Sequence, residues 1–129
     1  MLFVVFFVTS VNAQTEPANY TAAVNNFKLF YNSDQPDSIY KTFGPEMRNA
    51  LTPDQFRATS KQLKGQLENL QQTIFTSYTQ PVAIYKASFQ NGDLELKISL
   101  NNENKIIGLL LSPLTQPGKQ ADPSTGDRP

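Results

Sequence analysis

The sequence contains no cysteine and no histidine in its 129 residues. Histidine is the side chain that most often exchanges protons near neutral pH, and it is also the commonest metal ligand. Without cysteine, the chain forms no disulfide, no thiolate nucleophile and no sulfur-ligated zinc site. No other pattern of catalytic or metal-binding residues stands out. We therefore predict that the protein is not an enzyme, has no catalytic residues, and binds neither a metal nor a cofactor.

An excess of charge of either sign is also lacking, because 11 basic and 11 acidic side chains cancel at pH 7. Proteins that bind nucleic acid usually carry a surplus of lysine and arginine. We therefore expect no nucleic-acid partner. The apolar run Leu2–Val8 is far shorter than the about 20 residues with which a helix crosses a bilayer, so we also expect no membrane span.

The N-terminal segment has several features of a secretory signal peptide. The run Leu2–Val8 is followed by polar residues and by Val11-Asn12-Ala13, and small side chains are typical of a cleavage site. We predict a signal peptide over residues 1–13 and a leader over 14–18, although the basic residues that usually open a signal are missing. The alternative is a buried N-terminal strand. Export would place the protein in the periplasm or outside the cell.

The next part of the chain shows the spacing of helices. Apolar residues at positions 20, 24, 27 and 31 recur as the buried face of a helix does. Pro36 favours the start of a second helix, and Gly44-Pro45 ends that helix and begins a short one. Thr52–Gln55 (TPDQ) has the pattern of a capping box. It predicts a long helix whose apolar stripe runs to Leu70.

Beyond residue 70 the apolar period changes from about four to two, which is typical of strands. We place four strands at 72–79, 82–90, 93–101 and 105–112. Asn91-Gly92 predicts a tight type I′ turn, because both residues tolerate positive φ. The predicted fold class is α+β, with N-terminal helices packed on one face of a curved antiparallel four-stranded β-meander. The single domain spans 19–115, and the polar residues 116–129 form a disordered tail or linker stub.

The last predicted strand is unusual because it is apolar on both faces. It contains Ile106, Ile107 and Leu109–Leu111 in one short run. Such a strand either lies in the centre of a sheet or is covered by a partner. A homodimer formed through the sheet is one arrangement of the second kind.

Aromatic side chains are the candidates for a binding site. A cleft between the helices and the sheet would be lined by Tyr31, Tyr40, Phe43, Tyr85 and Phe89. At helical and strand spacing, however, such residues more often belong to the core, since tyrosine buries its ring and keeps its hydroxyl hydrated.

Ser38 and Lys41 match the S-x-x-K pattern, in which a lysine activates a serine nucleophile one helical turn away. A pattern with two fixed positions occurs often by chance. The further motifs of such enzymes are missing, so solvated helix surface is the favoured interpretation.

The segment FYNSDQPDSIYKTFGPEM (residues 30–47), followed later by YKASF (85–89) and IIGLL (106–110), resembles a family of bacterial exported domains of unknown function. The resemblance covers about residues 18–114. It implies a cystatin-like or nuclear-transport-factor-two-like fold, and such domains often precede a serine-hydrolase domain of the β-lactamase type. It supplies no catalytic residues. Residues 116–129 would then correspond to a linker toward such a hydrolase.

Taken together, these observations favour an exported, non-catalytic binding or accessory module, in a Gram-negative bacterium according to the resemblance. Its partner would be a small ligand, a cell-envelope polymer or another protein. One alternative is a small enzyme of the same fold that uses a tyrosine and a carboxylate. The other is a structural domain that dimerises.

Overall fold

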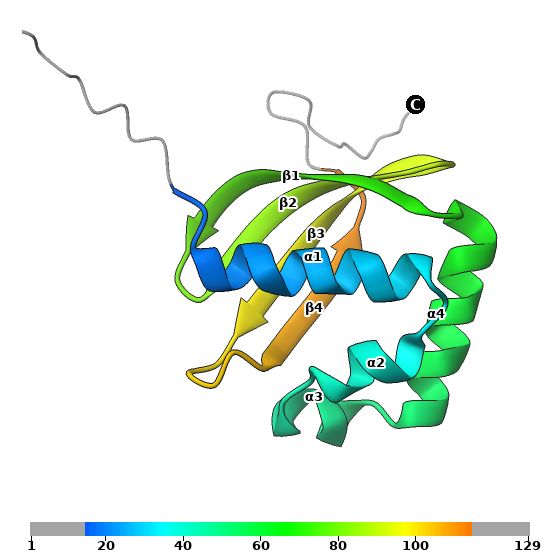
Figure 1. The fold of residues 1–129 in the computed structure, drawn as a ribbon, viewed down its shortest axis with the longest axis horizontal. Coiled ribbons are helices and arrows are strands. Elements are labelled where there is room, and N and C mark those ends of the chain that lie inside the picture. The colour runs from blue at the N-terminus through cyan, green and yellow to red at the C-terminus, as the bar shows by residue number, and fades with distance from the viewer. Residues whose placement is uncertain (1–14, 115–129) are drawn as a thin grey trace, which may run out of the picture.

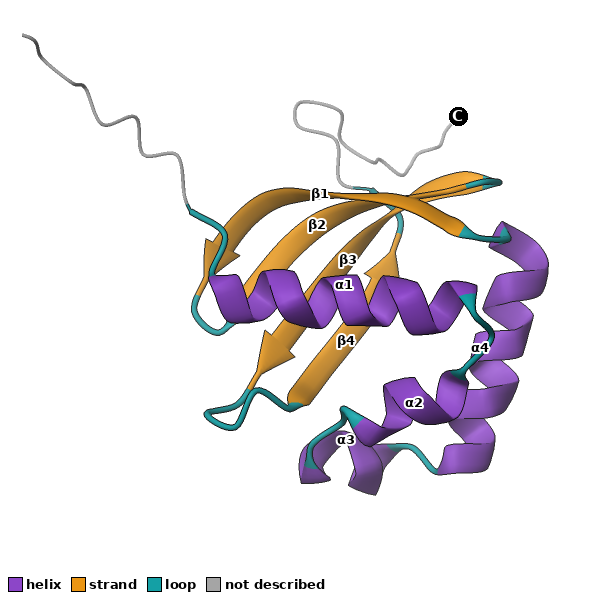
Figure 2. Ribbon diagram, in the orientation of Figure 1, coloured by secondary structure: helices purple, strands orange, loops and turns teal. Residues whose placement is uncertain are grey.

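A computed structural model describes residues 15–114, and it shows four helices followed by four strands (Figures 1 and 2). The elements are α1 (Ala18–Asn32), α2 (Pro36–Lys41), α3 (Pro45–Ala50), α4 (Pro53–Leu67), β1 (Leu70–Thr79), β2 (Val82–Phe89), β3 (Gly92–Leu100) and β4 (Ile106–Ser112). The strands form one antiparallel sheet in the order β1-β2-β3-β4. The predicted α+β class, with helices preceding an antiparallel meander, is confirmed.

The core lies between α1 and the sheet, which curves around this helix (Figure 1). Side chains alternate along the central strands, so that one face is buried: Ala83, Tyr85, Ala87 and Phe89 on β2, and Leu96, Ile98 and Leu100 on β3. They meet the predicted buried face of α1, formed by Tyr20, Val24, Phe27 and Tyr31. Each large apolar side chain contributes about 1.5–3 kcal/mol on burial, so this layer is the main source of stability.

The capping box that the sequence predicts is present at the start of α4. The Thr52 hydroxyl accepts a hydrogen bond from the Gln55 backbone N–H at 3.1 Å, and the Gln55 side chain accepts one from the Thr52 N–H at 2.9 Å. These two bonds satisfy donors that a helix start otherwise leaves unpaired.

The predicted length of α4 is wrong at its C-terminal end. The helix stops at Leu67, Glu68 adopts a left-handed φ of 64°, and Leu70 is the first residue of β1 rather than the last of the helical stripe. The reason is a long-range contact. Asn32, at the end of α1, donates to the Leu70 carbonyl at 2.9 Å and accepts from the Leu70 N–H at 2.8 Å, which holds Leu70 extended.

The turn between β2 and β3 lies one residue earlier than predicted. Phe89 pairs with Gly92, so the turn residues are Gln90 and Asn91, and neither has positive φ. Contacts with the end of α4 explain the shift. The Asn91 N–H donates to the Leu67 carbonyl at 3.1 Å, and the Asn91 side chain donates to the Gln66 carbonyl at 3.2 Å. A type I′ turn is therefore not formed.

Strand β4 lies at an edge of the sheet, so the prediction of a central position is wrong. Only its first residue has a second backbone neighbour among the described residues: Ile106 accepts from the Gly44 N–H and donates to the Thr42 carbonyl, both at 2.8 Å. The alternative, that a partner covers this strand, stays a prediction.

The predicted signal peptide (1–13) and tail (116–129) lie outside the described residues. Within residues 15–114, no helix combines the length and the apolar character that crossing a bilayer requires.

Candidate binding site

The five aromatic residues predicted as a binding site lie in or against the core. Tyr31, Phe43, Tyr85 and Phe89 are each at most 3% exposed, and Tyr40 is half-buried. Their rings pack on one another: the centroids of Tyr31 and Phe89 are 5.5 Å apart, and those of Tyr40 and Phe43 are 5.3 Å apart. These distances fall within the range of favourable ring pairs. The five rings therefore contribute to packing, and their role in binding stays a prediction.

The tyrosine hydroxyls of this set are already engaged. Tyr31 donates to the Glu68 carbonyl at 2.8 Å, and Tyr40 donates to the Leu51 carbonyl at 2.7 Å. Tyr85 donates to the Glu16 carboxylate at 2.6 Å. Each hydroxyl thus holds two segments of the chain together.

Burial also keeps two of these hydroxyls protonated. Burial raises the pKa of Tyr31 to about 12, and the negative charges of Glu68 and Asp34 add to this effect. Burial raises the pKa of Tyr85 strongly as well, with its hydrogen bond to Glu16 as the second cause. Both tyrosines are therefore neutral near neutral pH and act as hydrogen-bond donors rather than as bases.

An apolar hollow of about 260 Å³ opens between α1, α4 and β4, with α2 and α3 closing one end. We call it the apolar hollow. Its lining residues are all uncharged: Phe27, Tyr31, Ile39, Met47, Leu51, Phe56, Thr59, Ser60, Leu63, Leu109 and Leu111. Tyr31 is the one member of the predicted aromatic set among them.

The hollow exists because α4 presents small side chains where it faces β4. Thr59 and Ser60 lie between the larger Phe56 and Leu63 on this helix. Thr59 is exposed and Leu63 is only half-buried, so the hollow is open to solvent along this part of α4. A cavity of about 150 Å³ with an aliphatic and aromatic lining is large enough to bind benzene. The apolar hollow can therefore take a larger apolar group.

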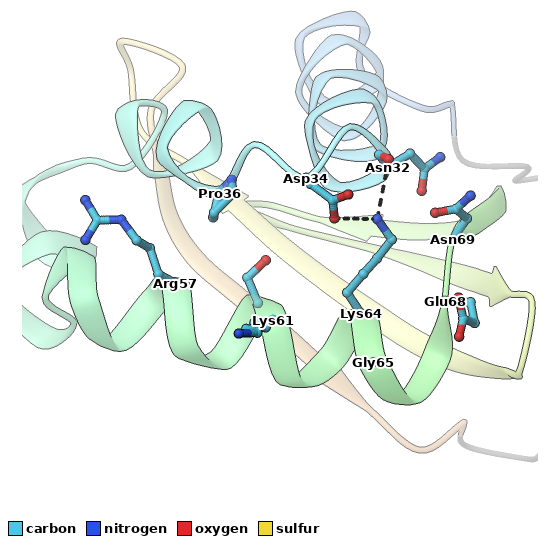
Figure 3. A pocket seen from close by; sticks show the side chains of 10 residues that line it. Asn32, Asp34, Pro36, Arg57, Lys61, Lys64, Gly65, Glu68 and Asn69 are labelled. Carbon is cyan, nitrogen blue, oxygen red and sulfur yellow. Dashed lines mark hydrogen bonds and ion pairs between the residues drawn. The ribbon is translucent and has the colours of Figure 1, made fainter.

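Figure 3 shows a broader polar groove, of about 770 Å³, along α4. Ser60 lines both this groove and the apolar hollow. Two of the groove's three cations, Lys64 and Arg57, are already paired, whereas Lys61 forms no ion pair within residues 15–114. The Lys64 amine lies 2.7 Å from an Asp34 oxygen and also donates to the carbonyls of Tyr31 and Asn32, at the end of α1. Arg57 pairs with Asp37 at 2.8 Å and with Asp54. These contacts join α4 to the end of α1, to Asp34 and to α2, so an anion that used Lys64 or Arg57 would have to displace them.

Ser38 and Lys41 line a third hollow, of about 390 Å³. The Ser38 hydroxyl donates to the Gln35 side-chain oxygen at 3.1 Å, and within residues 15–114 Ser38 and Lys41 form no hydrogen bond with each other. In the same part of the chain, no group of three acidic side chains is close enough to hold a metal ion. The arrangement thus offers no activated nucleophile at this position.

A comparison with protein families identifies the family of the chain. The model of a protein of unknown function (DUF3887) matches residues 24–109, more than half of the chain. The chain belongs to the DUF3887 family. Neither the curated proteins nor the solved structures give a match to it.

The matched part of this DUF3887 chain contains most of the apolar hollow. It runs from Val24 in α1 to Leu109 in β4 and includes all of α4. Sequence reasoning missed Thr59, Ser60, Leu109 and Leu111 as site residues. A signal was present, since two small polar residues interrupt the apolar stripe of α4 and the strand predicted last is apolar on both faces. Neither feature shows by itself that α4 and β4 face each other.

Proposed function

We propose that this DUF3887 chain is an exported, non-catalytic binding module that takes an uncharged apolar group into the apolar hollow. The observation that supports this most is the hollow itself, an opening of about 260 Å³ with an uncharged lining beside the buried core. Ligand sites are commonly concave and mostly apolar, with few polar groups. Here Thr59 and Ser60 supply the polar groups at the rim.

The absence of catalysis is part of this proposal. The tyrosine and carboxylate that a small enzyme of this fold would need are present as Tyr85 and Glu16, but they bond to each other and line none of the three hollows described above. A reacting group has to reach its substrate within about 3 Å. The pair is better explained as a contact that holds the segment before α1 against β2.

The accessory role belongs to the same proposal. The resemblance of residues 30–47 to exported domains that precede serine hydrolases suggests that the module acts beside such an enzyme in the cell envelope of a Gram-negative bacterium. The same resemblance suggests a cystatin-like or nuclear-transport-factor-two-like fold, and the helices packed on one face of a curved four-stranded meander agree with it.

Titration with toluene tests the proposal, because toluene is uncharged and small enough for the hollow. We expect saturable, weak binding, with a Kd of about 1 mM, and shifts of the NMR signals of Leu63, Leu109 and Leu111. Replacing Thr59 by tryptophan (Thr59→Trp) should fill the hollow and abolish these shifts. The matched control is Gln62→Trp, an exposed position on the same helix that does not line the hollow. Equal binding by both variants would place toluene elsewhere and refute the proposal.

A further inference from the structure

We propose that the free edge of β4 and the apolar hollow together bind an extended peptide segment of another protein. The segment adds to the sheet beside β4 and inserts an uncharged apolar side chain into the hollow. This inference rests on the proposed function, because it uses the same hollow. It goes further by naming the ligand as a polypeptide that is recognised through its backbone as well as its side chains.

The direction of the backbone groups in β4 is the first observation. The N–H of Leu100 points to the β2 side of β3, where it donates to the Tyr20 hydroxyl at 3.1 Å. Backbone groups alternate along a strand, so those of Ser99 and Lys97 point to β4 and bond to their partners Gly108 and Leu110. The N–H and C=O groups of Leu109 and Leu111 must then point away from the sheet.

These outward groups have no partner among residues 15–114. Hydrogen bonds to the outer side of β4 occur only at Ile106, which meets Thr42 and Gly44. Unpaired N–H and C=O groups on an edge strand are a template for a further strand. Proteins that avoid such pairing use charges, prolines or bulges. The register shift of β4 lies at Ile107, before Leu109, and residues 107–112 (IGLLLS) contain no charge and no proline.

The second observation is that the same two residues line the hollow. Leu109 and Leu111 turn their side chains toward α4 and their backbone groups toward the free edge. A chain added at this edge would place alternate side chains on the same face as these leucines. Those side chains would face the apolar hollow, so backbone pairing and side-chain insertion are available to one ligand at once. This combination is the strand-addition mode of peptide recognition.

The chemistry of the groove selects the occupant. A lipid or a small apolar ligand fills the hollow but leaves the backbone groups of Leu109 and Leu111 unpaired. A charged side chain would be buried against eleven uncharged residues without a partner. A second copy of the chain that paired through its own β4 would bring Leu109 and Leu111, which already line the hollow of that copy, so it would supply no further side chain to fill either hollow. These constraints favour a foreign segment with uncharged apolar residues at alternate positions.

The test uses a short capped peptide in which threonine alternates with valine around a central phenylalanine. Two further versions of the peptide are N-methylated. One carries the methyl groups on the amides of the odd-numbered residues, and the other carries them on the amides of the even-numbered residues. One N-methylated version should bind like the parent and the other should lose binding about tenfold or more, as the loss of a backbone hydrogen bond of 1–1.5 kcal/mol predicts. Hydrogen exchange at the amides of Leu109 and Leu111 should slow on binding, while Gly108 and Leu110 are protected with and without peptide.

A pair of protein variants tests the same contact from the other side. Leu111→Pro and Leu111→Ala both remove the leucine side chain, but only the proline removes the outward N–H. We expect the proline variant to bind the peptide about tenfold more weakly than the alanine variant, with equal toluene binding.

The outcomes separate this inference from the proposed function. If toluene fills the hollow but both N-methylated peptides bind equally, or the two Leu111 variants bind equally, strand addition is refuted and the binding module stands. If toluene does not bind either, the proposed function fails as well. If the solution mass is twice that of one chain and the amides of Leu109 and Leu111 are protected without peptide, a second copy occupies the edge and the inference is overturned.

Discussion

Strand β1 lies at one edge of the sheet and β4 at the other, and the chain covers the start of each edge in a different way. At β1, the Asn32 side chain makes two hydrogen bonds to Leu70, and the Lys28 amine donates to the Gln71 carbonyl at 2.9 Å. Register shifts between Leu70 and Gln72, and between Phe75 and Ser77, bend the same strand. At β4, only Ile106 is paired on its outer side among the described residues.

The difference teaches that the two edges of this sheet are protected by different devices. Side-chain caps and bulges are known devices against unwanted strand pairing, and β1 uses both. In β4 the register shift lies at Ile107, and residues 108–112, which follow it beside the apolar hollow, pair regularly with β3 and have no side-chain cap among the described residues. There, pairing and side-chain burial can occur together. The predictions below change one edge at a time, so that each result bears on this contrast.

The largest effect should follow from opening the covered edge. Replacing Asn32 by alanine removes both bonds to Leu70 and leaves the N–H and C=O of a residue that is 1% exposed without partners. We expect the free energy of unfolding to fall by about 2–3 kcal/mol, measured by urea denaturation.

The control for this variant is Asn25→Ala, an exposed position on the same helix, where the higher helix propensity of alanine should give a small gain in stability. Asn32→Asp keeps the acceptor for the Leu70 N–H but loses the donor, so its stability should be intermediate. If Asn32→Ala were as stable as Asn25→Ala, the cap on β1 would not contribute to stability.

The fold was predictable where its signals are local. The capping box at Thr52–Gln55, the alternation along β2 and β3 and the helical period of α1 are each contained in a few neighbouring residues, and all three are confirmed. The end of α4 was not predictable, because Leu70 continues the helical stripe by spacing. Long-range contacts with Asn32, 38 residues away in sequence, and with Phe89 on β2 hold it in the strand.

The candidate site was less predictable than the fold. The aromatic residues were predicted as site residues because of their type, yet the side chains of Phe43 and Phe89 are buried in the core. The hollow depends on which residues of α4 face β4, and these segments are joined through three other strands. A short side chain such as Ser60 is an ambiguous signal by itself, since small residues are equally common on solvated helix faces.

A smaller effect should appear at alkaline pH, again on the side of β1. The Tyr31 hydroxyl donates to the carbonyl of Glu68, just before this strand, and its pKa is raised to about 12. A raised pKa means that the neutral form is favoured by folding. The stabilisation is therefore complete below the unfolded pKa of about 10 and is lost as the pH rises through about 12.

The variant Tyr31→Phe isolates this effect. At pH 7 it should be less stable than the native chain by about 1 kcal/mol, because one hydrogen bond is lost. As the pH rises above about 10, this difference should shrink and then reverse, since phenylalanine does not ionise. Urea denaturation in a pH series measures this difference in the free energy of unfolding. The ionisation of the other tyrosines and of the lysines affects both proteins equally and cancels in the comparison. A difference that stays constant with pH would contradict the raised pKa.

The smallest effect should come from the outer face of β4. Leu110 is 54% exposed and pairs across the sheet with Lys97, so its side chain points away from the apolar hollow. Leu110→Thr should change stability by no more than about 0.5 kcal/mol and leave toluene and peptide binding unaltered. Leu109, one residue earlier, lines the hollow, so Leu109→Thr should weaken the binding of both toluene and the peptide. If Leu110→Thr weakened binding as much as Leu109→Thr, or changed the solution mass, the outer face of the sheet rather than the edge beside the hollow would be the contact surface.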